Sequence, residues 1–206
     1  FTFKAKPNMT HQRRTFISRF IGLLLGSQAR SQDQPEPAEI IDDLSKPAPM
    51  ASNGASWRVF TDTVMGGISK ATMSRETIAG KSALCLRGDV RLENNGGFVQ
   101  MSLDLLPDGT AVNASGWTGL EVDVLGNNEN YAINLRTAGL TRPWQSYRYE
   151  FIAPALWTTI RLPFHDFIQS RTDLALDISQ LKRIGVIAIG RSFHANIAIG
   201  SIRFFR

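Results

Sequence analysis

Apolar and polar residues alternate with a period of two along most of the chain after Trp57. The run Leu120–Val124 places its apolar side chains on one face and its acidic side chains on the other, and residues 131–136, 147–151 and 99–105 repeat this pattern. Such alternation is typical of half-buried strands in antiparallel sheets. The chain is therefore expected to form many short strands.

The last third of the sequence departs from simple alternation in three places. Residues 183–190 are almost continuously apolar, which indicates a central strand covered on both faces. The alternation in residues 196–205 slips at Gly200, which predicts a β-bulge. Asp177 followed by Gln180 resembles a capping box and predicts one or two helical turns. Together with Gly, Asn and Pro turns, this pattern predicts an all-β fold, a two-sheet antiparallel jelly-roll sandwich.

Residues 1–31 form a basic segment that we interpret as a targeting signal. They contain six Lys/Arg and no acidic residue, and the apolar stretch Phe20–Leu25 follows the pair Arg13–Arg14. The run "RRTFI" resembles a twin-arginine export signal, which predicts a periplasmic protein, whereas the acid-free, Arg-rich composition also fits a mitochondrial presequence. Both alternatives stay open beside a plain basic arm. The apolar stretch is far below the roughly 20 residues that span a bilayer, so no transmembrane span is expected.

Residues 32–55 are predicted to be a disordered linker, which leaves 56–206 as the folded domain. Four prolines stand among five acidic residues and small polar residues. Such a composition buries too little apolar surface to offset the entropy lost on ordering. The sequence is compatible with a helical turn at Ala38–Leu44, and Asp42 and Asp43 are expected to be solvated.

The net charge of +5 belongs mostly to the N-terminal segment. Residues 1–31 carry +6 and residues 32–50 carry −4, which leaves +3 for residues 51–206. No basic cluster of the kind that nucleic-acid binding needs is visible, so no nucleic-acid partner is expected. Cys85 is the single cysteine, which excludes an intramolecular disulfide and a zinc cluster. Its apolar neighbours predict a small buried hydrophobe.

The sequence contains no recognisable catalytic motif. A nucleophile elbow, a phosphate-binding loop and a dinucleotide fingerprint are all absent. His165 and Asp166 are adjacent, but on a strand they would point to opposite faces, so a solvated histidine is expected rather than a catalytic dyad. We therefore predict no enzyme activity, no catalytic residues, no bound metal and no cofactor.

The tryptophans divide into three expected core residues and one exception. Trp57, Trp117 and Trp157 are expected to fill the core, as large aromatic side chains do in a sandwich of this size. Trp144 follows Pro143 in a predicted hairpin loop, where packing explains a large ring less well. Because aromatic rings stack on sugar faces, Trp144 keeps open an alternative function, a carbohydrate-binding module-like sandwich that binds an envelope glycan.

Two stretches with adjacent glycines are the most specific local signals. "TDTVMGGIS" covers Thr61–Ser69 and "LENNGGFVQ" covers Leu92–Gln100. Asn and Gly tolerate the positive φ angles of tight turns, and paired glycines mark a demanding backbone path or a close approach. The candidate partner-binding residues are Asp62, Met65, Gly66, Gly67, Ser69, Asn94, Asn95, Gly96 and Gly97, together with Trp144.

These two stretches also carry a family resemblance. With "GWTGLEVDVLGN", "YAINLRT", "WTTIRLPFHDF" and "RIGVIAIG", the order of motifs across residues 57–206 resembles the complex I intermediate-associated family. The resemblance implies a galactose-binding-like jelly roll and a non-catalytic, chaperone-like role. Its partners would be subunits or assembly intermediates of respiratory NADH:ubiquinone oxidoreductase.

The residues suggest how such a motif could work. We hypothesise that Asp62 accepts backbone N–H bonds as in an Asx turn and that Met65 plugs the open end of the sandwich. Gly66 and Gly67 would then let this loop pass close to the turn at residues 94–97. Two interpretations stay open: a partner-binding rim formed by both loops, and a purely structural corner.

Overall fold

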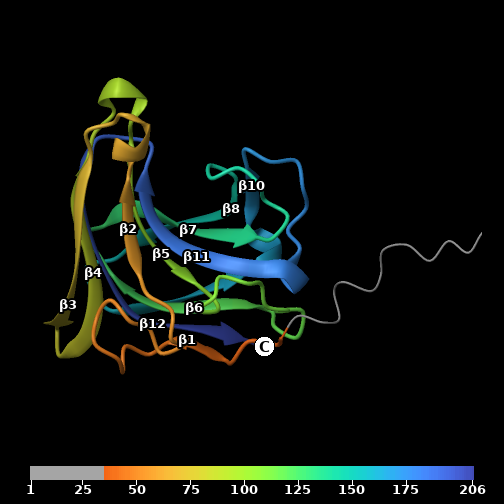
Figure 1. Cartoon of the computed structure of the whole chain (residues 1–206). Helices are drawn as coiled ribbons and strands as arrows, with labels where there is room; N and C mark the ends of the chain where they lie inside the picture. Colours follow the sequence, from red (N-terminus) through yellow and green to blue (C-terminus); the bar gives the residue numbers. More distant parts are fainter. Residues whose placement is uncertain (1–34) are drawn as a thin grey trace, which may run out of the picture.

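The computed structural model describes residues 35–206. The targeting segment predicted for residues 1–31 lies outside the described residues. The described chain folds into two six-stranded sheets whose strand pairs are antiparallel, as the alternation predicted. Figure 1 shows the two sheets as layers of one sandwich.

The first sheet has the order β3–β4–β12–β6–β9, and β1 pairs with β12. Its strands are β1 (Ile40–Asp42), β3 (Lys70–Ile78), β4 (Lys81–Val90), β6 (Gly119–Leu125), β9 (Thr158–Pro163) and β12 (Phe193–Phe205). The second sheet has the order β10–β8–β7–β11–β5–β2. Its strands are β2 (Arg58–Thr61), β5 (Phe98–Asp104), β7 (Glu129–Thr137), β8 (Ser146–Ala153), β10 (Ile168–Ser170) and β11 (Leu181–Ile189).

Helical structure in residues 35–206 is limited to four short 3-10 turns. They are η1 (Asp62–Met65), η2 (Glu93–Asn95), η3 (Phe164–Asp166) and η4 (Ile178–Gln180). The capping signal before β11 is confirmed as one short turn, because the Asp177 carboxylate accepts the Ser179 N–H at 3.0 Å. This part of the chain has no helix with the length and apolar character needed to cross a membrane.

The core lies between the sheets and is built from the apolar positions of the alternating strands. Leu120, Val122 and Val124 of β6 are fully buried, as are Met101 and Leu103 of β5. Burial of such side chains contributes roughly 1.5–3 kcal/mol each. The facing polar positions are left on the outer faces of the two sheets.

The two irregularities predicted for the C-terminal strands are confirmed. β11 is a central strand between β7 and β5, and both Val186 and Ile187 are buried although they point to opposite faces. The pairing of β12 with β6 shifts register between Ile199 and Ile202, around Gly200. A Cβ at Gly200 would lie 3.0 Å from the Cβ of Asp123, so the missing side chain lets the strands approach at the bulge.

The prediction of a disordered linker over residues 32–55 is wrong for its described part, residues 35–55. Ile40–Asp42 forms strand β1, which pairs with β12, and not the helical turn with which the sequence is compatible. Ile41, Leu44 and Ala51 are buried in the main core. The composition of the segment led to a wrong prediction because only a few of its apolar residues need to be buried for it to be ordered. The segment also gains backbone hydrogen bonds by pairing with β12, which the composition does not reveal.

Asp42 is buried, so the prediction that it is solvated is also wrong. Its carboxylate accepts the Trp57 indole N–H at 2.7 Å and the backbone N–H groups of Leu44 and Ser52 at 3.0 and 3.1 Å. The carboxylate is buried with these donors. It fastens the segment before the domain to the start of β2.

His165 and Asp166 do touch, contrary to the prediction. They lie in η3 rather than on a strand, and a 3-10 turn brings His165 Nε2 to 3.3 Å from Asp166 Oδ1. Both side chains are exposed to solvent. Asp166 is among the residues that line a pocket beside β8 and β10, whereas His165 is not.

Candidate functional site

The two glycine corners meet at one end of the sandwich. η1 and η2, which follow β2 and β4, lie next to each other at the top of Figure 1. The Asp62 carboxylate joins them, because its Oδ2 accepts the Gly97 N–H at 2.6 Å and the Phe98 N–H at 3.3 Å. The structure therefore brings together two stretches that lie more than 30 residues apart in the sequence.

The Asp62 carboxylate is fully buried and fully used. Besides the two donors of the second corner, it accepts the Ser69 N–H at 2.9 Å and the Ser69 hydroxyl. Burial alone raises the pKa of Asp62, but the hydrogen bonds from Ser69, Gly97 and Phe98 outweigh burial and hold the pKa below its ordinary value. Asp62 thus accepts backbone N–H groups as predicted, but the donors are Ser69, Gly97 and Phe98 rather than the residue two positions on that an Asx turn would use.

Ser69 ties the same corner to the end of β4. Its hydroxyl oxygen accepts the Arg91 N–H at 2.9 Å while the hydroxyl group donates to Asp62. Ser69 is itself fully buried. Substituting either side chain would therefore free donors from both corners.

Glycine is required at these positions for different physical reasons. Gly66 ends η1 with φ of +89°, in the left-handed region that glycine favours, and no atom lies within 4 Å of the place its Cβ would take. A Cβ at Gly67 or at Gly96 would instead overlap the Asp62 carboxyl group. Gly67 and Gly96 thus leave room for the carboxylate, whereas Gly66 sets the turn.

Asn94 and Asn95 shape the second corner without joining the hydrogen-bond network. Their φ angles are +58° and +59°, and both residues are exposed. Asn tolerates this left-handed conformation better than most residues. Gly97 follows with φ of +129°, and a Cβ there would press on the Leu92 side chain at 2.8 Å.

Met65 does not plug the sandwich, and this prediction is wrong. Its side chain is 56% exposed because η1 turns it away from the core once Asp62 takes the inward position. Three further apolar side chains of the two corners are also exposed. We call the four together the apolar edge: Val64, Met65, Ile68 and Leu92, with exposed fractions from 43% to 71%.

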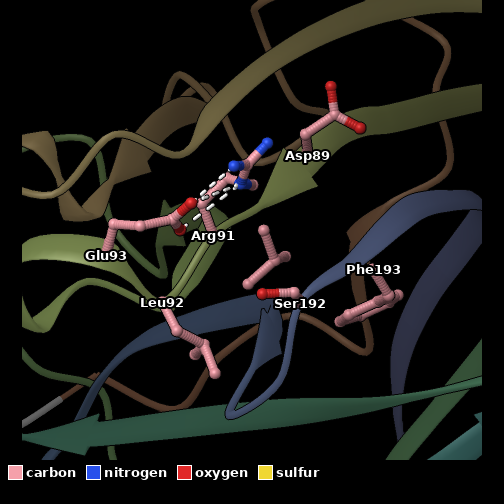
Figure 2. Close-up of a pocket in the computed structure, with 7 residues that line it drawn as sticks. Asp89, Arg91, Leu92, Glu93, Ser192 and Phe193 are labelled. Carbon is pink, nitrogen blue, oxygen red and sulfur yellow. Dashed lines mark hydrogen bonds and ion pairs between the residues drawn. The ribbon is translucent and has the colours of Figure 1, made fainter.

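A pocket lies next to the apolar edge, between η2 and the β11–β12 turn. Its volume is about 730 Å³, and it is lined by Asp89, Val90, Arg91, Leu92, Glu93, Ser192 and Phe193. Figure 2 shows the ion pair between Arg91 and Glu93 on one side, with Ser192 and Phe193 across from it. The pocket is open to solvent and combines an apolar floor with charged side chains. The pocket could not be predicted from the sequence, because Ser192 and Phe193 are far from residues 89–93 in the chain and lie next to them only after folding.

Trp144 lies away from the two corners. β7 starts beside the corners, where Glu129 pairs with Arg191, and runs away from them, so the loop after β7 lies at the far end of the strands. The ring is 52% exposed, as the loop position suggested. Arg136 fixes this loop, since its guanidinium donates to the carbonyl groups of four loop residues, Leu140, Arg142, Pro143 and Gln145.

Trp57, Trp117 and Cys85 are buried as predicted, but Trp157 is only half-buried and does not fill the main core, so the prediction for it is wrong. Trp57 and Trp117 belong to the main core. Trp157 packs with Cys85 in a small cluster on the outer face of the first sheet, and its indole donates to the Ile78 carbonyl at 2.9 Å. Burial raises the pKa of the Cys85 thiol, so it is kept in its unreactive form.

Among residues 35–206, no three His, Cys, Asp or Glu side chains gather in a group that could hold a metal ion. Asp62 is the one candidate acid, and all its described contacts are structural donors that a substrate could not displace without cost. What the corners offer to solvent is the apolar edge.

Comparison with known sequences supports the family suggested by the motifs. The sequence profile described as Complex I intermediate-associated protein 30 (CIA30) matches residues 45–197. The chain belongs to this family. The match begins inside the range predicted to be a linker, in agreement with the packing of residues 44–55 on the domain. No curated protein matches the chain in sequence.

The fold of this chain is shared by carbohydrate-binding modules. A family 11 module from Clostridium thermocellum aligns with a TM-score of 0.63 and 14% identity, covering 84% of this chain and 96% of that one. The same family's module in complex with a β-1,3-1,4-mixed-linked tetrasaccharide gives 0.61 and 15%, covering 81% and 94%. A family 30 module of C. thermocellum gives 0.50 and 14%, covering 82% and 93%. At these identities the likeness concerns the jelly-roll fold alone.

Proposed function

We propose that this CIA30 domain is a non-catalytic protein-binding domain that assists the assembly of NADH:ubiquinone oxidoreductase. Its membership of a complex I intermediate-associated family supports an assembly role. In this role it binds subunits or assembly intermediates in a chaperone-like manner and releases them unchanged. The apolar edge at the two joined corners is its proposed contact surface.

The observation that carries this proposal is the exposure of four apolar side chains on a fixed backbone. Single exposed apolar residues are common, but a group of them marks an interaction site. Here Val64, Met65, Ile68 and Leu92 all belong to the two corners that Asp62 locks together. A locked backbone lowers the entropy that binding costs. In this proposal the Asp62 network serves binding as well as closing the turn.

Affinity capture from the native organism, followed by mass spectrometry, tests this function. The full chain is compared with the double variant Val64→Ser, Met65→Ser. The proposal expects complex I subunits among the captured proteins and their loss with the double variant. Recovery of envelope proteins only would redirect the function.

A matched control separates lost contacts from lost folding. The double variant Ile40→Ser, Leu156→Ser removes two other exposed apolar side chains, one from β1 and one from the loop between β8 and β9. It should capture the same subunits as the unaltered chain. If both double variants lose them equally, general surface apolarity rather than the apolar edge is responsible.

Carbohydrate binding is the second candidate function. The exposed Trp144 ring on a loop fixed by Arg136 favours it, and the fold is shared with sugar-binding modules. A shared fold is a weak argument, because one fold hosts many functions. A glycan array with the full chain tests this function. Specific sugar binding that Trp144→Ala abolishes would favour it, and a blank array would exclude the glycans tested.

A further inference from the structure

The outer face of the second sheet carries long polar side chains on four neighbouring strands. Because Val99, Met101 and Leu103 of β5 point into the core, Gln100, Ser102 and Asp104 point outward. The same alternation places Asn134 and Arg136 of β7 on this outer face. It also places Arg148, Glu150 and Ile152 of β8 there.

Arginines outnumber acids on this face. Arg58 and Arg183 both pair with Asp104, which leaves that carboxylate fully occupied. Arg136 is used by the carbonyl groups of the Trp144 loop. One further guanidinium, that of Arg148, forms no salt bridge within residues 35–206.

Arg148 is held in place but not neutralised. Its Nε donates to the Asn134 Oδ1 at 3.2 Å, while its two terminal nitrogens have no acceptor in the described part of the chain. The side chain is half-buried, and burial lowers the pKa of Arg148, with the nearby Arg171 acting in the same direction and Glu150 against it. Glu150 offsets part of the cost of burying this cation but forms no ion pair with it within residues 35–206, so the two terminal nitrogens are left for a further carboxylate.

An amide row continues the site across the sheet. Gln100 accepts a long hydrogen bond from the Asn134 amide at 3.4 Å, and Asn134 is paired with Arg148 across β7 and β8. The Gln100 amide lies over Gly185, where a Cβ would come within 2.9 Å of its nitrogen. Gly185 thus lets the row lie flat on the sheet.

The first sheet shows the opposite arrangement on its outer face. Glu121 accepts from both Arg161 and Arg203, and Lys81 pairs with Asp123. Each of these cations has a carboxylate partner. These outer-face cations of the first sheet are thus neutralised, unlike Arg148, although Arg75 on β3 also has guanidinium nitrogens without a partner.

We propose that the outer face of the second sheet binds an acidic side chain of a partner protein, with Arg148 as its anchor. A guanidinium fork binds a carboxylate through two parallel N–H···O bonds. A pocket of about 400 Å³ beside Arg148 gives the side chain room. Glu150 and Asp166 also line it, so the contact with the Arg148 fork has to outweigh their repulsion. This inference rests on the proposed function, because it takes the partner to be a protein.

The surroundings of Arg148 favour a peptide over an acidic sugar. Ile168 stands directly opposite Arg148 on β10, and Ile152 follows on β8, both largely exposed. Aliphatic side chains fit apolar residues that flank a glutamate or aspartate. The aromatic residue that lines this pocket, Tyr149, is half-buried against Phe167 and the core, so its ring is less available for stacking on a sugar. The expected ligand is an extended segment in which an acidic residue lies between apolar ones.

Two blocked peptides, Leu-Glu-Leu-Glu-Leu and Leu-Gln-Leu-Gln-Leu, test this proposal by NMR titration of the full chain. The Glu peptide should shift the signals of Arg148, Asn134 and Gln100 in a saturable way, and the Gln peptide should not. Arg148→Gln should weaken the affinity for the Glu peptide by about tenfold or more, because a charge-assisted bidentate contact is lost. Arg148→Lys, which keeps the charge without the fork, should bind with intermediate strength and provides a second variant if Arg148→Gln folds poorly.

A control variant tests whether binding depends on Arg148 in particular. Arg161→Gln removes a cation from the first sheet's outer face and should leave binding unchanged. Equal binding of both peptides, shifts confined to other surfaces, or unchanged binding by a folded Arg148→Gln would overturn the proposal. Binding of trigalacturonate through Arg148 without peptide binding would assign the site to an acidic sugar instead.

The variant of the apolar edge distinguishes a failure of this inference from a failure of the proposed function. Val64→Ser, Met65→Ser should bind the Glu peptide like the unaltered chain, because β7 and β8 lie outside the two corners. Loss of capture with that variant alongside a failed peptide titration would reject the Arg148 site only. An intact peptide titration without complex I subunits in the capture would reject the assembly role only.

Discussion

Two buried aspartates lie at the two ends of β2 and solve the same local problem with different results. Asp42 receives donors from Trp57, Leu44 and Ser52 before the strand. Asp62 receives donors from Ser69 and the second corner directly after it. Each carboxylate joins segments that are distant in sequence and satisfies backbone N–H groups that no strand pairing would reach.

The surroundings of the two carboxylates differ. Around Asp42 the fastened segment buries its own apolar residues, Ile41, Leu44 and Ala51. Around Asp62 the fastened corners turn Val64 and Met65 outward. The first network is explained by completing the core. The second holds apolar side chains in water, which folding alone does not explain, and this difference supports a binding role for the corners.

The largest expected effect comes from removing either carboxylate. Asp62→Ala and Asp42→Ala should each destabilise the domain by about 4 kcal/mol, because several buried donors lose their acceptor. Urea denaturation measures both. In the folded fraction at low temperature, Asp62→Ala should also lose complex I subunits in capture, whereas Asp42→Ala should keep them. Equal capture by the two variants would remove the distinction drawn between the two networks.

The adjacent glycines give the next largest effect. Gly67→Ala should cost about 2 kcal/mol, because its Cβ overlaps the Asp62 carboxyl group. Gly66→Ala should cost about 1 kcal/mol, because only the positive φ is strained and the space is open. Thermal unfolding compares the two. A larger loss for Gly66→Ala would mean that the turn rather than the carboxylate network governs the corner.

Acid titration addresses the charge of Asp62. Its folded pKa is lowered, so its contribution is fully present above its unfolded pKa of about 4 and is lost as pH falls through the folded pKa. Asp62→Asn should therefore lose less stability than the unaltered chain on going from about pH 5 to about pH 2. Urea midpoints across this range measure the difference. Parallel curves would show that Asp62 does not titrate differently in the folded state.

The smallest expected change in stability comes from the apolar edge itself. Val64→Ser with Met65→Ser should alter the free energy of unfolding by no more than about 0.5 kcal/mol, since exposed substitutions away from networks rarely do more. Calorimetry of the full chain checks this value. A loss of several kcal/mol would show that these side chains pack in the domain and would weaken their assignment as a contact surface.

Much of the fold followed from local pattern. The alternation in β5, β6, β7 and β8 predicted half-buried strands, and the apolar run of β11 predicted a central strand. Side chains on a strand alternate between faces, so the sequence records which face is buried. The same reasoning failed at Ile40–Asp42, because a three-residue strand leaves too short a pattern to be recognised.

The candidate site was predicted only in part. The motif identified Asp62 and the paired glycines, and the structure joins their corners as expected. It misplaced Met65, and it gave no sign of the exposed Val64 and Leu92 or of the pocket at Ser192 and Phe193. Exposure depends on which neighbours surround a turn, and those neighbours come from strands far away in the chain.

The sequence by itself determined the all-β architecture, the family and the residues able to make tight corners, because periodicity and the φ preferences of Gly and Asn are local properties. Only the tertiary structure decided which carboxylates are buried, which loops meet and which arginine is left without a partner. Burial, charge pairing and contact depend on distances across the sheets. Asp42 and Asp62 show this directly: both are aspartates in turn-rich stretches, and only folding reveals what each one holds together.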